Sequence, residues 1–485
     1  MPLSLTTELA LVLVGAFLLL GVLASKASSK LGIPGLLLFI GIGMLAGSDG
    51  PGRIAFDDFA LTKVIGTLAL ACILFAGGLD TDWNVIRPVV WRGLSLSTVG
   101  VLTSALLVGV FAHRFLGLSL MEGLLLGAIV SPTDAAAVFG VLRSQGLNLR
   151  HRITPLLEFE SGTNDPLAVF LTAGLTHLLA NPDEGAATLL KGFLTQMPIG
   201  LVIGVASGEL AVRLINRIRL EYDGLYPVIT IALLSMTFGG APLVGGNEFL
   251  AVYVAGLTMG RKNFLHKLSL LQFHDGLAWL MQIVMFLALG LLSYPSQLAQ
   301  VAGAGIALSL FLVFVARPVT VFISLAFTRM KKRAKFVVAW AGLRGAVPII
   351  LATFPLMAGE PKAPLMFNLV FFVVLVSVMV QGTTLPLVCR WLGVLQKGPE
   401  ASKQLTRARG SDLLEVTLGA GSEAVGKMMV QLPLPRTALA VLLKRDGEGY
   451  IPKGGTVLRE GDVLLIATRK EDEGELRAIF SGRGG

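Results

Sequence analysis

The sequence predicts an all-α protein that crosses a membrane many times and carries a small α+β domain at its carboxyl end. Of its 485 residues, 54% are hydrophobic and only 15% are charged, which is too apolar for one soluble core. Runs of about 20 apolar residues, the length of a membrane-spanning helix, recur as far as residue 395. The remaining residues lose this pattern and alternate short apolar runs with turn residues.

The apolar runs predict about thirteen transmembrane helices in a domain over residues 1–395. The first run follows Glu8 without a basic stretch, so we expect a retained span and not a cleaved signal peptide. The predicted spans lie at 4–24, 32–48, 61–80, 91–113, 120–143, 154–180, 188–218, 224–241, 247–261, 273–293, 297–328, 335–358 and 364–394.

Lys and Arg are concentrated in alternate loops, for example at Arg150, Arg152 and Lys331–Arg333. Because basic residues near span ends stay in the cytoplasm, the amino terminus is predicted outside and the carboxyl terminus inside. The net charge of +9 reflects this topology, and no basic face with interleaved aromatic residues predicts a nucleic-acid partner.

A polar linker is predicted at 396–410, followed by a cytoplasmic domain at 411–485. Such a short domain holds a modest core, so pairing with a second copy is expected. Strands are predicted at 413–418, 438–443 and 463–467, and helices at 424–432 and 473–480.

Two predicted spans contain helix-breaking residues at matching places. The fifth carries Pro132, and the twelfth carries Gly342, Gly345 and Pro348. They are the fifth spans of two six-helix halves, 1–6 and 8–13, whose orientations in the membrane are opposite. This pattern is typical of inverted-repeat secondary transporters, in which crossed discontinuous helices form an ion site at mid-membrane.

The pair Asn164-Asp165 lies in an otherwise apolar span. A carboxylate in lipid is costly and usually faces an ion path, a proton relay or a paired charge. The alternative is a cap at a helix end. Burial favours the protonated acid and a nearby cation favours the carboxylate, so Asp165 is predicted to bind either a proton or a monovalent cation.

Further oxygen ligands for a cation are predicted from Thr133, Ser161 and freed carbonyls near 131–133. The alternative for both hydroxyls is a hydrogen bond to a carbonyl one turn earlier. Arg344 needs a partner at mid-membrane, and Glu160 is the expected one, because it lies four residues before Asn164 on the same helix face. Asp134 is expected to cap a half-helix, with a part in ion access as the alternative.

Three motifs together resemble the sodium or potassium/proton exchanger branch of the monovalent cation/proton antiporter superfamily. They are Ser131-Pro-Thr-Asp134, Glu160-Ser-Gly-Thr-Asn-Asp165 and Gly342-Leu-Arg-Gly-Ala346, and the resemblance extends over about 5–395. The stretches Phe273–Trp279 and Phe286–Leu292 resemble the bacterial potassium/proton subfamily.

The tail resembles the C-terminal lobe of the regulator of potassium conductance fold, the RCK_C or TrkA-C type. The residues concerned are Gly421-Ser, Gly426-Lys, Tyr450-Ile-Pro and Gly461-Asp-Val-Leu-Leu465. This resemblance implies a regulatory domain with a nucleotide or cyclic dinucleotide effector. No Gly-x-Gly-x-x-Gly lobe precedes it, so NAD-type control is not predicted, and no cofactor is expected.

The resemblance implies that an Asn-Asp pair accompanies electroneutral exchange, with Asn164 orienting its neighbours and Asp165 alone titrating. It implies that Glu160 and Arg344 form a structural ion pair. It also implies a homodimer, through the membrane domain and the tail, in the bacterial inner membrane with lipid around it.

The predicted function is therefore exchange of cytoplasmic potassium for external protons, one for one, by alternating access. A sodium/proton antiporter of the same fold is the alternative. A potassium channel is a more remote one, because no Thr-Val-Gly-Tyr-Gly-type filter occurs. An enzyme is not predicted, since neither Gly-x-Ser-x-Gly nor His-Glu-x-x-His is present. No metal is expected beyond the transported cation.

Overall fold

The chain forms two compact units, Met1–Leu395 and Gln396–Gly485. The predicted linker at 396–410 lies outside the residues that the structure describes. The computed structural model describes residues 7–31, 35–54, 56, 58–150, 152–218, 220–395, 412–419, 421–422, 424–435, 438–445, 448–450, 452–468 and 472–480.

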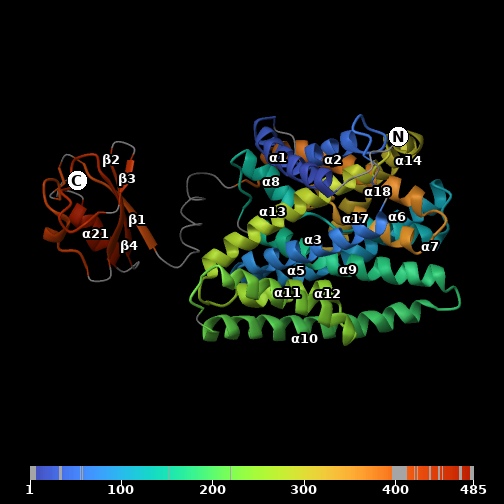
Figure 1. The fold of residues 1–485 in the computed structure, drawn as a ribbon, viewed down its shortest axis with the longest axis horizontal. Helices are drawn as coiled ribbons and strands as arrows, with labels where there is room; N and C mark the ends of the chain where they lie inside the picture. The colour runs from blue at the N-terminus through green and yellow to red at the C-terminus, as the bar shows by residue number, and fades with distance from the viewer. Residues whose placement is uncertain are drawn as a thin grey trace. The chain divides into compact units, whose positions relative to one another are not determined.

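The first unit consists of helices (Figure 1). Its first half contains α1 (Thr7–Leu31), α2 (Gly35–Ala46), α3 (Phe59–Asp80), α4 (Trp83–Ile86), η1 (Arg87–Val89), α5 (Val90–Ser95), η2 (Leu96–Gly100), α6 (Val101–Phe115), α7 (Leu120–Ile129), α8 (Ala135–Ser144) and α9 (Thr154–Ala180). After α10 (Ala186–Ile218) come α11 (Leu225–Leu243), α12 (Glu248–Gly260), α13 (Lys267–Leu292), α14 (Pro295–Phe311), η3 (Leu312–Ala316), α15 (Arg317–Ser324), α16 (Lys332–Trp340), α17 (Val347–Met357), α18 (Ala363–Ser377), η4 (Val378–Gly382) and α19 (Thr383–Trp391).

The helical membrane fold predicted from the sequence is confirmed. Each predicted span overlaps one of these helices or a run of consecutive ones. In the described part of the chain, seven helices or runs are long and apolar enough to cross a membrane. The segment Leu11–Lys26 of α1 and the helices α2, α7, α12 and α17 are shorter apolar helices. Thirteen crossings remain a prediction.

Both predicted helix interruptions occur. Residues 130–134 separate α7 from α8, and residues 341–346 separate α16 from α17. Elsewhere the long helices continue through irregular turns, because η2, η3 and η4 are π-helical segments inside runs that do not break. The two interrupted helices therefore expose backbone groups in the interior of the unit.

Small residues allow the helices to approach closely. A Cβ atom on Gly43 of α2 would lie 2.7 Å from the Cα atom of Gly290 in α13, and one on Gly127 of α7 would lie 2.8 Å from the Cα atom of Ala105 in α6. Without a hydrophobic driving force between helices in lipid, such contacts are a main source of packing energy. In Figure 1, α10, α11 and α12 lie side by side, and α12 also packs against α3.

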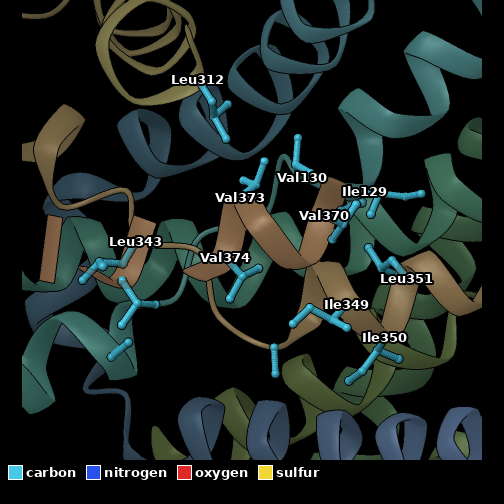
Figure 2. Close-up of a cluster of buried hydrophobic side chains, with 14 of the residues drawn as sticks. Ile129, Val130, Leu312, Leu343, Ile349, Ile350, Leu351, Val370, Val373 and Val374 are labelled. Carbon is cyan, nitrogen blue, oxygen red and sulfur yellow. The ribbon is translucent and has the colours of Figure 1, made fainter. Parts of the chain in front are cut away.

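An apolar cluster surrounds the two interruptions (Figure 2). Ile129 ends α7, Val130 begins the first interruption, Leu343 lies in the second, and Val370 and Val374 come from α18. All five side chains are almost completely buried. Polar groups in the interruptions are thus enclosed by hydrocarbon, where unpaired charges are expensive.

In its described residues, the second unit is a four-stranded antiparallel sheet of order β1-β4-β2-β3 with the α-helix α21. Two features differ from the prediction. The short strand β3 was missed, and residues 424–432, predicted as a helix, form turns and the single 3₁₀ turn η5. The elements are β1 (Asp412–Thr417), η5 (Met429–Gln431), β2 (Leu439–Arg445), β3 (Glu448–Tyr450), β4 (Val463–Thr468) and α21 (Glu473–Phe480).

The physical reason for the missing helix is backbone pairing across the chain. Gly426 has a φ of 80°, a conformation that glycine adopts without strain but that ends a helix. Its amide donates to the carbonyl of Leu458, and the amide of Val430 donates to the carbonyl of Gly454. These bonds replace the bonds to the fourth preceding residue that a helix would make.

A buried ion pair closes the turn before β4. Nε and Nη2 of Arg445 donate to the two carboxylate oxygens of Asp462, each at 2.7 Å, and Asp462 is completely buried. The hydrogen bonds from Arg445 hold the pKa of Asp462 below its ordinary value. An unfolded Asp titrates near pH ~4, so the pair stabilises the folded domain above that pH, and this stabilisation is lost as pH falls through the lowered pKa.

We expect Asp462→Asn to speed hydrogen exchange in β2 and β4 at pH 7, because Arg445 loses its counterion while remaining partly buried. Exchange is measured by mass spectrometry on the full chain. The matched control is Arg477→Met, which removes an exposed pair with Glu473. Equal exchange in both variants would show that the Asp462 pair does not stabilise the domain. Lowering the pH below about 4 is expected to shrink the difference between Asp462→Asn and the unsubstituted chain.

Candidate ion-binding site

The first interruption is shaped by hydrogen bonds at its two ends. Ser131 Oγ donates to the carbonyl of Ala128 at 2.8 Å, at the end of α7. Asp134 is the N-cap of α8, where its carboxylate accepts from the amide of Ala137 at 2.9 Å. Pro132 has no amide hydrogen, so it cannot continue the α7 ladder.

The second interruption contacts the first directly. The amide of Asp134 donates to the carbonyl of Leu343 at 2.8 Å. Gly345 lies against the Asp134 side chain, because a Cβ atom there would be 2.8 Å from both Cβ and Cγ of Asp134. Pro348 lies in the first turn of α17, where a missing amide hydrogen costs little. The two broken helices therefore meet at their unwound segments.

We expect Gly345→Ala to disrupt this contact, since backbone or Asp134 must shift to admit one methyl group. The expected result is a loss of at least tenfold in proton-coupled cation flux in proteoliposomes, with a lower midpoint of thermal unfolding. Gly140→Ala is the control, because no atom lies within 4 Å of its added Cβ and alanine favours the helix. Equal flux in both variants would mean that close approach at Gly345 is not needed.

Arg344 holds the first interruption in place. Its Nη1 donates to the carbonyls of Ser131 at 2.6 Å and Pro132 at 2.8 Å, while its own amide donates to Ser377 Oγ at 3.0 Å. The residue is 1% exposed. Two of the carbonyls expected to complete a cation shell are thus already engaged by a guanidinium.

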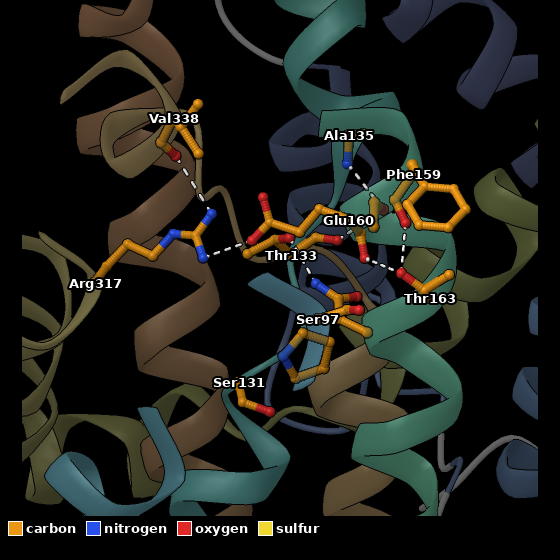
Figure 3. A network of polar contacts seen from close by, with 12 residues as sticks. Ser97, Ser131, Thr133, Ala135, Phe159, Glu160, Thr163, Arg317 and Val338 are labelled. Carbon is orange, nitrogen blue, oxygen red and sulfur yellow. Dashed lines mark hydrogen bonds and ion pairs between the residues drawn. The ribbon is translucent and has the colours of Figure 1, made fainter. Parts of the chain in front are cut away.

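The prediction that Glu160 pairs with Arg344 is wrong, because another arginine is the partner of Glu160. In the structure Glu160 Oε1 lies 2.7 Å from Nη1 of Arg317, and Nη2 of Arg317 donates to the carbonyl of Val338 at 3.3 Å. Figure 3 shows Arg317 extending across to Glu160. The contact is an ion pair by distance but not a well-aligned hydrogen bond.

Local packing explains why Arg317 takes this place. It opens α15 directly after the π-helical turn η3, and both charged side chains are at most 4% exposed. Gly342 gives it room, since a Cβ atom there would lie 3.1 Å from Cδ of Arg317. Sequence reasoning missed Arg317, although an arginine inside an apolar span is itself the signal of a buried partner.

One face of α9 is tied to the first interruption. Ser161 Oγ donates to the carbonyl of Thr133 at 2.8 Å and accepts from the amide of Ala135 at 3.2 Å. Asn164 Nδ2 donates to Thr133 Oγ1 at 2.8 Å. Both Ser161 and Thr133 therefore bond between helices, and the alternative of back-bonding one turn earlier does not describe them.

Asp165 lies inside α9, eleven residues beyond its start at Thr154 and 6% exposed, so the alternative of a helix-end cap is wrong. Its Oδ1 and the Oδ1 of Asn164 are buried and have no hydrogen-bond partner among the described residues. Asp165 also interacts electrostatically with Asp134. Two consecutive residues of α9 thus each have a buried acceptor without a partner among the described residues, and such an oxygen favours a proton or a hard cation.

Sequence comparison finds two matching families. Residues 15–391 match the transmembrane sodium/hydrogen exchanger family, and residues 413–481 match the TrkA-C domain. The K(+)/H(+) antiporter NhaP2 from Shewanella sp. (strain MR-4) is 40% identical over 479 residues, which are 97% of this chain and 83% of that protein. The K(+)/H(+) antiporter NhaP from Alkalimonas amylolytica is 37% identical over 480 residues, 98% of this chain and 83% of that one.

A solved structure has the same membrane fold. The sodium proton antiporter MjNhaP1 from Methanocaldococcus jannaschii superposes with a TM-score of 0.69 at 24% identity, over 78% of this chain and 100% of that chain. From the same organism, the probable Na(+)/H(+) antiporter 2 is 29% identical over 351 residues, 68% of this chain and 81% of that protein.

Proposed function

This chain belongs to the sodium/hydrogen exchanger family, and from that premise we propose that it exchanges cytoplasmic potassium for external protons. Potassium is favoured over sodium because the relatives that match nearly the whole chain, tail included, are named K(+)/H(+) antiporters. Sodium/proton exchange is the alternative, since a more distant relative is named a probable Na(+)/H(+) antiporter.

The observation that carries the proposal is the buried carboxyl group of Asp165, whose Oδ1 has no hydrogen-bond partner among the described residues. Burial makes an ionised carboxylate without a partner costly, so it binds either a proton or a cation before it moves. Each ligand displaces the other, and exposure of the site to one side at a time then couples the two fluxes.

The contacts of the neighbouring residues support the following proposed roles. Asp165 binds the proton or the cation, with oxygen ligands from Thr133 and Ser161. Asn164 holds α9 to the first interruption and does not titrate. Asp134 organises the start of α8.

The buried charges support one-for-one exchange. Near the site, Glu160 and the partly buried Asp134 contribute two negative charges, and Arg317 and Arg344 contribute two positive charges that balance them. Two further buried charged residues of the described helical unit, Glu122 and Lys335, have opposite signs. Asp165 adds one further negative charge, which one proton or one monovalent cation neutralises. The loaded site is neutral in both forms, so neither half of the cycle moves net charge across the membrane.

The proposal also covers topology, assembly and control. Basic loops place the amino terminus outside and the tail in the cytoplasm of a bacterial inner membrane. Leu19, Val202 and Phe314 are exposed apolar side chains, and we propose that such residues face lipid. The protein forms a homodimer through the membrane domain and the tail, and the TrkA-C domain takes a nucleotide or cyclic dinucleotide effector.

Proteoliposomes with an internal pH dye test the proposal. We expect an outward potassium gradient to drive proton uptake, a smaller response to sodium, and no change in initial rate when valinomycin sets the membrane potential. Proton uptake driven equally by sodium would support the sodium alternative. A rate that follows the imposed potential would contradict one-for-one exchange.

A further inference from the structure

A second carboxylate, Glu158, lies on the same face of α9 as Asp165, seven residues earlier. Seven residues are about two helical turns, so the two acids are separated by about 10 Å along the helix. Glu158 is exposed, whereas Asp165 is buried. Asp80 at the end of α3 and Arg143 in the last turn of α8 both interact electrostatically with Glu158. One face of α9 therefore carries an exposed carboxylate and, two turns on, a buried one.

Gly162 lies between the two acids and is covered by Tyr253 of α12. A Cβ atom on Gly162 would lie 2.6 Å from Cζ and 2.8 Å from the hydroxyl oxygen of Tyr253. The phenol end of Tyr253 thus packs against the α9 backbone at a position that has no side chain. Pro166 lacks an amide hydrogen, so the carbonyl of Gly162 also loses its usual intrahelical donor.

The hydroxyl of Tyr253 is unsatisfied. The residue is 2% exposed, and its oxygen has no hydrogen-bond partner among the described residues. It interacts electrostatically with Glu158. Packing alone does not require this oxygen, because a phenylalanine ring would fill the same space, and a buried hydroxyl without a partner is destabilising.

The position of Tyr253 is fixed by its own helix. A Cβ atom on Gly256 of α12 would lie 3.0 Å from the amide of Leu79, and one on Gly78 of α3 would lie 2.9 Å from the amide of Leu257. These close approaches lock α12 to the end of α3 that carries Asp80. The hydroxyl therefore stays at Gly162 without help from a hydrogen bond.

We propose that Glu158 and Tyr253 form a cation access path to Asp165, in which Glu158 attracts the cation and the Tyr253 hydroxyl and Gly162 carbonyl coordinate it at a constriction. The inference rests on the proposed function. A monovalent cation that leaves water needs replacement oxygens, and these two groups lie between the exposed acid and the buried one. Glu158 and Tyr253 act on the cation during uptake, and Asp165 remains the exchanging group.

Cation titrations of exchange in proteoliposomes test the path. Tyr253→Phe keeps the ring and removes only the oxygen, and Glu158→Gln keeps the shape and removes the charge. Each is expected to raise the KM for potassium about fivefold while the maximal rate changes less than twofold. The effect of Glu158→Gln is expected to shrink as ionic strength rises with an impermeant salt.

Matched controls separate this role from a structural one. Tyr226→Phe removes another buried tyrosine hydroxyl, one that accepts from the amide of Leu220, and Glu221→Gln removes an exposed charge in the loop before α11. Both are expected to leave the potassium KM unchanged. An unchanged KM in Tyr253→Phe, or a fall in maximal rate alone, would overturn the proposal.

Failure of the path is distinguishable from failure of the proposed function. If the unsubstituted chain exchanges cations and Asp165→Asn does not, while Tyr253→Phe and Glu158→Gln match the unsubstituted chain, only the path is contradicted. If the unsubstituted chain shows no cation-dependent proton flux, the proposed function itself fails.

Discussion

Asp165→Asn is expected to reduce proton-coupled cation exchange to the level of empty liposomes. The amide has nearly the shape of the carboxylate but neither binds a proton nor carries a charge to hold a cation. Its Oδ1 atom has no protein partner to lose among the described residues, so the variant should fold and unfold at a temperature at least as high as the unsubstituted chain. Flux is measured with an internal pH dye, and folding by thermal unfolding in detergent.

The control for this variant is Asp183→Asn, which changes an exposed residue in the loop between α9 and α10. It is expected to retain full exchange. Residual exchange by Asp165→Asn above the empty-liposome level would remove Asp165 from the centre of the mechanism. If Asp165→Asn lost exchange and also unfolded at a lower temperature, the prediction that the substitution leaves the fold intact would be wrong.

The second large effect is expected at the ion pair between Glu160 and Arg317. Removing one member leaves the other charged and buried without a partner, which costs about 3–5 kcal/mol. Arg317→Met and Glu160→Gln should each lower the unfolding temperature strongly, whereas the double variant should recover most of the loss. Reversible unfolding in denaturing detergent gives the three free energies for this cycle.

An exposed pair supplies the comparison. Lys262→Met breaks the contact with Glu209, where the lysine side chain is 41% exposed, and should cost less than about 1 kcal/mol. If the losses in unfolding free energy of Glu160→Gln and Arg317→Met add up in the double variant, the two residues do not form a direct pair. Coupling of Glu160→Gln with Arg344→Met in place of Arg317→Met would restore the partner predicted from sequence.

The overall fold was predictable because its determinants are local. The length of each apolar run predicted a membrane-spanning helix. Pro132, Gly342 and Gly345 indicated the two places where a helix could not continue. The pairing of charges was not local. Arg344 and Arg317 are both arginines in apolar spans, and only the three-dimensional crossing decides that Arg344 reaches two carbonyls while Arg317 reaches Glu160.

Within the site, the residue types were predictable but their hydrogen bonds were not. The oxygen or amide groups of Thr133, Ser161 and Asn164 were predictable from the sequence. The hydrogen bonds that Ser161 and Asn164 make to Thr133 depend on how α9 crosses residues 130–134. The π-helical turns η2, η3 and η4 carry no breaker at a fixed place, so periodicity does not reveal them. Tyr253 was missed because an aromatic residue on an apolar helix normally indicates packing.

The central claim is that one carboxyl group, Asp165, binds either a proton or a cation. Proton release during cation binding tests it most directly. The purified chain in weakly buffered detergent solution is titrated with potassium, while bound cation and released protons are both counted. We predict that at acidic pH one proton leaves for each cation bound, and that Asp165→Asn releases none. Cation binding without proton release, or equal release by Asp165→Asn, would contradict the account.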